Sequence, residues 1–331
     1  MKTLDELMQH LRESGIAISE ERQRRELKNI GYYHGYKGYR FAGVASNRFH
    51  ITDFSQIVAL NDFDMEVKTL LYSKVMLIET ALKNHVLEAV LADAQSTSFD
   101  QVYAKSMTAY QTHKGTKAYK SALLKRMRLK SEVDTLMMQR YRCSAPVIQH
   151  FLDEDRSVPL WALFEVMTLG TFGTFYSCLA QQVQNVVVAG LHMPSNFDSA
   201  SILGNIIFAL KDLRNAVAHN GVTVDVRFKN ASVNHDIGKM LAADAGVNMI
   251  DFSEITDYVI LIAYLLFKLQ IPEDDIASFL NSYRNILNRY KPLLPQPIFS
   301  RLVHTNAFHK LSRTEQFIYT GTANADDISH V

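Results

Sequence analysis

The chain is poor in cysteine. Only two cysteines occur in 331 residues, Cys143 and Cys178, and they are far apart with no Cys-x-x-Cys pair. A disulfide scaffold and a cysteine-based zinc site are therefore excluded as organising features. The histidines are scattered and lack carboxylates at ligand spacing, so we expect neither a metal nor another cofactor. This cysteine usage is typical of a reducing compartment, and we expect a cytoplasmic protein.

Long hydrophobic runs are also missing. The first residues, Met1 to Glu6, contain no apolar core of the kind found in signal peptides. The most apolar run, Val259 to Phe267, is much shorter than the roughly 20 residues that a helix needs to cross a bilayer. We therefore expect no contact with a membrane.

Charge of one sign is not in excess over the whole chain, but it is in excess locally. The 35 Lys and Arg residues against 34 Asp and Glu residues give a net charge of +1, which argues neither for nor against nucleic acid. Residues 117–142 are strongly basic, with Glu132 and Asp134 as the only acids. A one-sided basic face suits phosphates, although a solvated surface explains it equally well. The candidate RNA-binding residues here are Lys117, Lys120, Lys125, Arg126, Arg128 and Lys130.

Apolar residues recur at helical spacing along most of the chain. This pattern predicts a predominantly α-helical, all-α fold. Residues 93–116 are polar and small and indicate a loop or a partly ordered segment. Gly170 and Gly173 indicate a helix break, and the alternating residues 222–228 indicate a short strand or extended arm. The predicted helices cover 3–14, 19–30, 61–91, 117–142, 147–153, 157–170, 175–184, 199–219, 235–245, 252–270 and 273–290.

One predicted helix ends in a cluster of residues that could act on a phosphate. Asn215 and His219 are four residues apart and share a helix face, and Arg214 adjoins them. Asn220 and Gly221 indicate the end of the helix. A histidine suits general acid or base catalysis, and an arginine offers a fork of donors to a phosphate. From spacing alone, surface charge at a helix end is the more usual explanation.

Two carboxylates are candidates for a supporting role. Glu79 lies near the apolar stripe of its helix, four residues before Lys83, so a simple ion pair is the favoured explanation. Glu165 is flanked on its helix by Trp161 and Leu169, which predicts partial burial and a need for a partner such as Arg214. A structural salt bridge is again the default explanation.

Residues 30–41 form a glycine-broken, tyrosine-rich segment. Its tyrosines could stack on bases while Lys37 and Arg40 bind phosphates. The alternative is an aromatic clasp packed on the helices, and we favour the clasp.

Beyond these local patterns, the chain resembles known families. The sequence Arg214-Asn215-x-x-x-His219 resembles the RNxxxH form of the Rx4-6H motif of HEPN-domain ribonucleases. Four blocks within about residues 20–225 resemble the Abi-like (AbiD/AbiF) proteins of bacterial abortive-infection systems, with an extra residue before Gly38-Tyr39 and Lys83 in place of a frequent arginine. The blocks are Ile30-Gly31-Tyr32-Tyr33 with Gly38-Tyr39, Phe63-Asp64-Met65-Glu66-Val67 leading into Ile78-Glu79-Thr80-Ala81-Leu82-Lys83, Val158–Gly170, and Leu213-Arg214-Asn215 through Ala218-His219-Asn220.

The resemblance carries its own expectations. It implies a HEPN-type helical bundle, RNA as substrate or regulatory ligand, and phage defence or a toxin–antitoxin system as the setting. It also implies a metal-independent endoribonuclease with Arg214, Asn215 and His219 as catalytic residues, or alternatively a non-catalytic HEPN module that binds RNA or a partner protein. Because the chain has one Arg-Asn-x-x-x-His and HEPN nucleases pair two, we expect a homodimer, with an antitoxin as a further candidate partner.

The expected division of the chain has four parts. These are N-terminal helices with the tyrosine-rich loop in 1–57, the HEPN-like bundle in 58–222, a C-terminal helical subdomain in 223–312 and a loose tail in 313–331.

Overall fold

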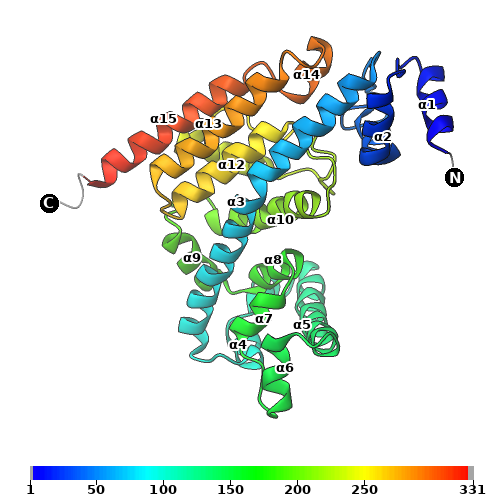
Figure 1. The fold of residues 1–331 in the computed structure, drawn as a ribbon. Coiled ribbons are helices and arrows are strands. Elements are labelled where there is room, and N and C mark those ends of the chain that lie inside the picture. The colour runs from blue at the N-terminus through cyan, green and yellow to red at the C-terminus, as the bar shows by residue number, and fades with distance from the viewer. Residues whose placement is uncertain (1–2, 327–331) are drawn as a thin grey trace. The chain divides into compact units, whose positions relative to one another are not determined.

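The computed structural model describes residues 3–326, with side chains to residue 321, and their regular elements are all helices (Figure 1). This confirms the predicted all-α fold. The only β-type pairings among these residues are isolated bridges, such as that between Phe41 and Arg48. Residues 222–228, predicted as a short strand or an extended arm, form no strand but turns and irregular backbone, because their backbone groups bond to side chains from elsewhere in the chain. No helix in 3–326 combines the length and apolar character needed to cross a bilayer.

The chain forms two compact units, and the first combines two segments that are separated in the sequence by the second. The first unit comprises the residues up to Val75 and those from Asp212 onward, and the second comprises Met76–Lys211. These borders differ from those at 57, 222 and 312 because N-terminal and C-terminal segments share one core. The helices α3 (Phe54–Ala94) and α10 (Ser199–Ala218) contribute residues to both units. Because 54–94 contains neither proline nor glycine, α3 starts earlier than the predicted residue 61 and runs without interruption.

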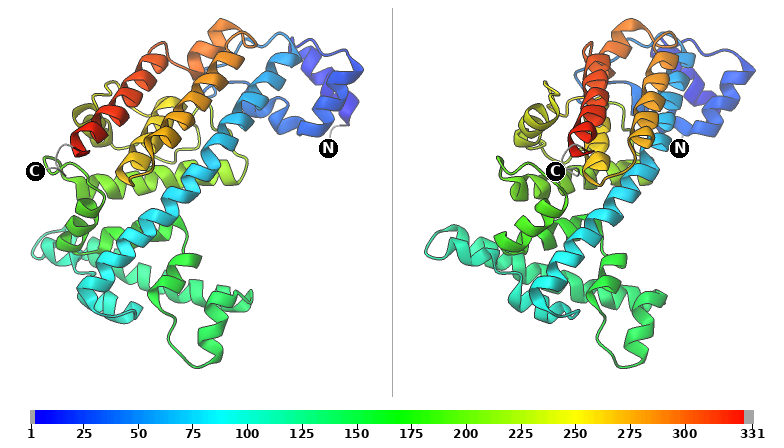
Figure 2. Two further views of the ribbon diagram at one scale, coloured as in Figure 1. Left: turned by 60° about the vertical axis from the view of Figure 1, so that its left-hand side comes forward. Right: turned by 90° about the vertical axis from the view of Figure 1, so that its left-hand side faces the viewer.

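The first unit is built around a helix that is buried on every side. All residues of α12 from Ile255 to Leu266 are buried, as expected for a helix that is apolar all round. Figure 2 shows α13 and α15 running side by side next to it, and Phe317 of α15 packs on Tyr264 and Phe267. Besides parts of α3 and α10, the helical elements of this unit are α1 (Leu4–Glu13), α2 (Glu21–His34), the 3-10 turn η1 (Lys37–Tyr39), α11 (His235–Ala245), α12 (Ile255–Lys268), α13 (Glu273–Tyr290), α14 (Gln296–Leu302) and α15 (Ala307–Asp326).

The second unit packs short helices on the basic helix α5. Residues 93–116, predicted as a loop or a partly ordered segment, contain two helical segments, and Val102 and Met107 there are fully buried. Gly170 and Gly173 lie within a helix, and the break comes earlier, at Met167 and Thr168, where Thr168 caps the next helix. The elements are α4 (Phe99–Lys105), the 3-10 turn η2 (Ala109–His113), α5 (Ala118–Arg142), α6 (Pro146–Asp153), α7 (Leu160–Val166), α8 (Leu169–Cys178) and α9 (Gln181–Gly190).

The predicted loose tail is also corrected. Residues 313–326 continue α15 as a helix, because Leu311, Thr314 and Ile318 are buried against the rest of the first unit. Residues 327–331 of the predicted tail lie outside the described residues.

Candidate functional site

The end of α10 presents three polar side chains on an otherwise buried helix. Leu213 and Val217 are buried, whereas Asn215 and His219 are exposed and Arg214 is partly exposed. The Arg214 guanidinium lies 3.5 Å from the Asn215 side-chain oxygen. The backbone N–H of His219 donates to the Asn215 carbonyl at 3.0 Å, which places the two residues one turn apart on one face. The predicted cluster is therefore present and accessible to solvent.

The backbone fixes where His219 lies. Asn220 adopts the left-handed conformation, with φ of 54°, and the Gly221 N–H donates to the Ala216 carbonyl at 2.7 Å. This six-to-one bond across a left-handed residue is the Schellman ending of a helix. The predicted stop signal is confirmed, and His219 is the last residue before the chain turns away.

A buried carboxylate holds the segment that follows the turn. Asp64 of α3 is fully buried, and its Oδ1 accepts the Thr223 N–H at 2.7 Å, the Thr223 hydroxyl at 2.6 Å and the Val224 N–H at 3.1 Å. Its Oδ2 accepts the Tyr39 hydroxyl at 2.9 Å and lies 2.9 Å from the Lys68 ammonium. Burial raises the pKa of Tyr39, and the Asp64 charge raises it further, so the phenol stays protonated and donates.

Lys68 links this carboxylate to the end of α10. The buried Lys68 ammonium donates to the Asn220 side-chain oxygen at 2.5 Å and to the Gly221 carbonyl at 3.3 Å. The Asn220 side-chain nitrogen lies 3.4 Å from His34 Nε2. Because the Asn220 amide nitrogen can only donate, His34 Nε2 is the acceptor and Nδ1 carries the proton. Burial lowers the pKa of His34, and the nearby Lys68 lowers it further, which agrees with a neutral ring.

The tyrosine-rich loop is part of the same scaffold. Arg227 donates to the Phe41 carbonyl at 2.8 Å and stacks on the Phe41 ring at 4.4 Å, and Asp225 accepts the Gly43 N–H at 2.9 Å. Tyr32 and Tyr36 pack against His10 of α1 and against each other, with ring centres about 6 Å apart. These contacts match the favoured interpretation of the loop as an aromatic clasp.

The two basic residues predicted in this loop differ in exposure. Lys37 is exposed, with its ammonium 5.3 Å from the centre of the Tyr32 ring. Arg40 is partly buried, and its guanidinium lies 5.8 Å from the centre of the Phe41 ring. Lys37 is thus the more accessible of the two to a phosphate.

The two candidate carboxylates occupy different environments within the second unit. Glu79 is buried and pairs with Lys83 at 3.0 Å, which is the favoured ion pair, and Lys83 also donates to the Met167 carbonyl at 2.8 Å. That bond satisfies the backbone where α7 ends. Glu165 is exposed, so its predicted partial burial is wrong: it lies on the solvent face of α7, beside Trp161, which is itself 44% exposed.

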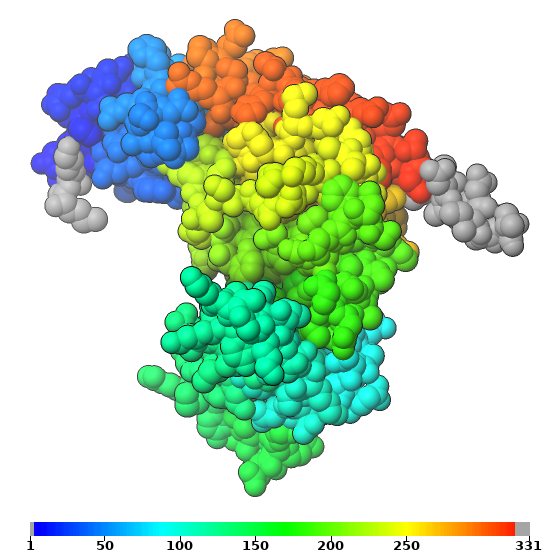
Figure 3. Space-filling view, turned by 180° about the vertical axis from the view of Figure 1, so that it is seen from behind, coloured from blue at the N-terminus to red at the C-terminus, as the bar shows by residue number. Residues whose placement is uncertain are grey.

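The basic residues of α5 fall into two groups. Arg126 donates to the Tyr103 carbonyl at 2.6 Å with its guanidinium 3.6 Å from the centre of the Tyr103 ring, and Lys130 pairs with Asp100 at 2.6 Å. Arg140 also has a partner, since it donates to the Val166 carbonyl at 3.5 Å. Four other cations make no hydrogen bond or ion pair with residues 3–326, and they line a groove of about 610 Å³ along α5. Figure 3 shows the α5 segment (teal) at the molecular surface. The groove residues are Lys117, Lys120, Lys125 and Arg128.

A metal centre finds little support in the described part of the chain. Residues 3–326 contain no group of three or more His, Cys, Asp or Glu side chains that could hold a metal ion. Around the end of α10, Asp64 is already bonded on both oxygens, and the two histidines there, His34 and His219, are joined by no third such ligand among the described residues.

Comparison with known families decides the assignment. Residues 25–224 match the family model described as "Abi-like protein", which spans more than half of the chain. The chain belongs to the Abi-like protein family. Membership suggests a role in abortive infection, a form of phage defence. Neither the search of the curated proteins nor that of the solved structures found a match.

In this Abi-like protein, three of the four blocks noted in the sequence converge on one network. Tyr39, Asp64 and Asn220 come from the first, second and fourth blocks, and all three take part in the bonding around Lys68. Sequence reasoning missed Asp64, Lys68 and His34. A usable signal was present for the first two, since they interrupt the apolar positions of a long helix four residues apart, which is the spacing of an ion pair.

Proposed function

We propose that this Abi-like protein is a metal-independent endoribonuclease of the HEPN type that acts in the cytoplasm during phage defence. The ribose 2′-oxygen attacks the adjacent phosphorus while the bond from phosphorus to the 5′-oxygen breaks. The 2′-hydroxyl proton goes to a base, and the leaving 5′-oxygen receives a proton from an acid. The products are a 2′,3′-cyclic phosphate and a 5′-hydroxyl.

The motif residues take distinct roles in this proposal. His219 is the general acid or base, a role worth about 10²- to 10⁴-fold in rate. Arg214 stabilises the charge that develops on the phosphoryl oxygens, since a guanidinium offers several donors in one plane. Asn215 orients the phosphate or the histidine from the same helix face.

One chain supplies one such histidine, whereas the reaction needs both a base and an acid. We therefore propose a homodimer in which His219 and Arg214 of two copies share one cleft. The observation that carries the proposal is the exposure of Asn215 and His219 at a helix end. The residues that follow this end are bonded to the buried Lys68 and Asp64. A catalytic group on a fixed backbone loses little entropy on reaching the reactive geometry.

A second candidate function rests on a different observation. The four cations of the α5 groove, which make no ion pair with residues 3–326, offer a phosphate-binding surface that does not depend on cleavage. In this alternative the protein is a non-catalytic module that binds a regulatory RNA. A protein or RNA antitoxin would bind either form.

The test is a cleavage assay in EDTA. The parent, His219→Ala and His219→Gln are incubated with mixed cellular RNA, and the ends of the products are identified. His309→Ala is the matched control, because His309 is an exposed histidine of α15 in the same unit with no bond to a described residue. We expect the parent and the control to leave cyclic phosphate ends and both His219 variants to lose about 10²-fold or more in rate.

The outcome separates the two functions. Cleavage by His219→Ala at the parent rate overturns the catalytic role of His219. Absence of cleavage by a dimeric, RNA-free parent that still binds RNA supports the non-catalytic module. Size-exclusion chromatography with light scattering tests the dimer, and an active monomer contradicts the shared cleft.

A further inference from the structure

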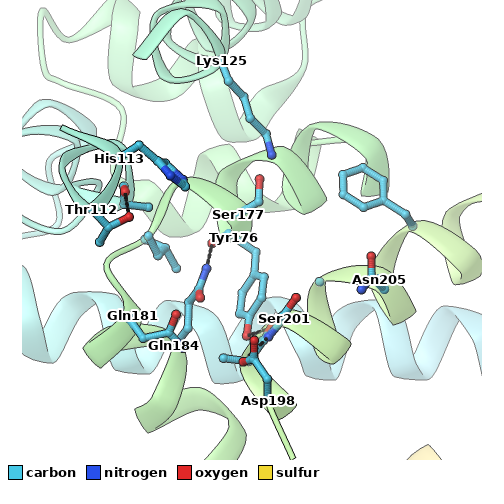
Figure 4. A pocket seen from close by; sticks show the side chains of 15 residues that line it. Thr112, His113, Lys125, Tyr176, Ser177, Gln181, Gln184, Asp198, Ser201 and Asn205 are labelled. Atoms are coloured by element: carbon cyan, nitrogen blue, oxygen red, sulfur yellow. Dashed lines mark hydrogen bonds between the residues drawn. The ribbon is translucent and has the colours of Figure 1, made fainter. Parts of the chain in front are cut away.

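The second unit contains a polar cavity that the proposed cleavage chemistry does not use. It has a volume of about 430 Å³, within the range of roughly 300–1,000 Å³ that small-molecule sites occupy. Its walls come from η2, α5, α8, α9 and the first half of α10, all within the second unit. Figure 4 shows the side chains that line it.

The floor of the cavity is held in place by its own hydrogen bonds. Tyr176 is almost fully buried, and its hydroxyl donates to the Ala200 carbonyl at 3.0 Å, so α8 and α10 are joined here. The Gln184 amide donates to the Tyr176 carbonyl at 2.8 Å. Asp198 caps α10 by accepting the Ser201 N–H at 3.2 Å. A ligand would thus meet a surface that is already formed.

Several side chains around the cavity retain unused hydrogen-bonding capacity. Ser201 and Asn205 lie one turn apart on α10 and project toward the cavity in Figure 4, and their side chains make no hydrogen bond within residues 3–326. Beside them the Phe208 ring lies against α8, where Gly173 leaves room for it: a β-carbon at Gly173 would stand 3.0 Å from that ring. An amide, a hydroxyl and an aromatic ring together suit the edge and the face of a nucleobase.

The two ends of the cavity carry side chains of opposite charge. Lys125 and Asp198 lie at opposite ends of the lining in Figure 4. Lys125 is exposed and makes no ion pair with a described residue, so it can receive a phosphate, whereas the Asp198 carboxylate repels one and accepts ribose hydroxyls or base amino groups. A bound nucleotide would therefore place its phosphate toward α5 and its base toward α10.

Lys125 lines both the cavity and the basic groove along α5, so the two meet at this residue. We propose that the cavity binds one unstacked nucleotide of a single-stranded RNA whose neighbouring phosphates lie along Lys117, Lys120 and Arg128. This inference rests on RNA being the ligand of the protein, and it assigns a recognition site in the second unit, within a segment that does not contain His219.

The experiment measures binding apart from cleavage. All proteins carry His219→Ala and are kept in EDTA, and the affinity for a short, mixed-sequence single-stranded RNA is measured by fluorescence anisotropy. The variants are Asn205→Leu, which removes the free amide, and Ser201→Phe, which fills the cavity from an exposed position. The matched control is Gln139→Leu, which removes an exposed amide from α5 outside the cavity lining. Calorimetric titrations with the four nucleoside 5′-monophosphates, the four nucleosides and inorganic phosphate follow.

We expect Asn205→Leu to weaken RNA binding by about tenfold, the loss of one good hydrogen bond, and Ser201→Phe to weaken it at least as much, with unchanged melting temperatures. We expect Gln139→Leu to bind RNA like its parent, and at least one monophosphate to bind more tightly than its nucleoside and than phosphate. The proposal is overturned if both cavity variants bind RNA as tightly as the protein that carries only His219→Ala. This holds even if a free nucleotide binds tightly. It is also overturned if inorganic phosphate binds as tightly as the nucleoside monophosphates. If the protein with an intact His219 binds RNA without cleaving it, the nuclease proposal is wrong, but this binding test still applies.

Discussion

The buried polar cluster around Asp64 and the basic groove on α5 handle charge in opposite ways. In the Asp64 cluster, both carboxylate oxygens and the Lys68 ammonium are bonded to partners within the first unit. In the groove, Lys120 and Arg128 are exposed and make no bond with the described residues. Charge that is buried and fully paired fixes a backbone, whereas charge that is exposed and unpaired is available to a ligand. The two regions should therefore respond to substitution in different assays.

The largest effect is expected from Asp64→Ala. The variant leaves the Lys68 ammonium and the Thr223 N–H buried without their carboxylate, and breaking a buried pair in this way costs about 3–5 kcal/mol of unfolding free energy. Urea unfolding followed by circular dichroism measures it. Asp62→Ala is the control, because Asp62 lies two residues away on the same helix and is exposed. Equal losses for the two variants would contradict the structural role of the cluster.

A second buried ion cluster allows the role of buried charge to be tested through the pH dependence of stability. Lys310 donates to Glu254 at 2.8 Å and to Asp257 at 2.7 Å, and all three are buried. Burial raises the pKa of Asp257 to about 6 from 3.8. In the parent, the stability contributed by its proton is therefore fully present below pH 3.8 and is lost as the pH rises through about 6.

Lys310→Met removes the counter-ion from both carboxylates. We expect a loss of about 3 kcal/mol at pH 8, above the pKa of Asp257, and a clearly smaller loss at pH 5, where Asp257 takes up a proton. Urea unfolding of the parent and the variant at the two pH values measures this. A loss that does not depend on pH would show that the carboxylates do not carry the effect.

The smallest effect on stability is expected in the groove. Lys120→Ala combined with Arg128→Ala should leave the melting temperature unchanged, since neither side chain has a partner in residues 3–326. RNA affinity should become less sensitive to salt, with the slope of log affinity against log salt decreasing by about 1.4 if both residues contact phosphates of a single strand. Anisotropy titrations at several salt concentrations test it. An unchanged slope would show that the groove does not contact the phosphates of the RNA.

How far the sequence predicts these regions follows from the range of the interactions involved. The helix that ends in His219, its stop at Asn220 and the pair of Glu79 with Lys83 depend on residues four or five positions apart, so their spacing predicts them. The Asp64 cluster joins residues about 160 positions apart, which no local pattern contains. Of the two forms predicted for 222–228, a strand or an extended arm, the strand is absent for the same reason, because Asp64 accepts backbone donors that a neighbouring strand would have bonded.

The basic run on α5 shows a different limit. Its net charge was evident, but the separation of Arg126 and Lys130 from the four groove residues depends on Tyr103 and Asp100 of α4, which lie more than twenty residues earlier. The cavity beside α10 likewise needs residues from five elements. Composition therefore predicts that a surface is basic, and tertiary packing decides which of its cations remain available.

The long separation between Asp64 and its partners also has a consequence for synthesis on the ribosome. The Thr223 N–H and hydroxyl that bind Asp64 are translated 159 residues after it. A nascent chain that stops within Met76–Lys211 holds only the first portion of the first unit and has not reached His219. One that stops just after His219 has the histidine but lacks the residues that anchor the turn behind it. The end of α10 is therefore fully assembled only in chains that have been translated well past residue 224. Truncated products of an interrupted message lack it.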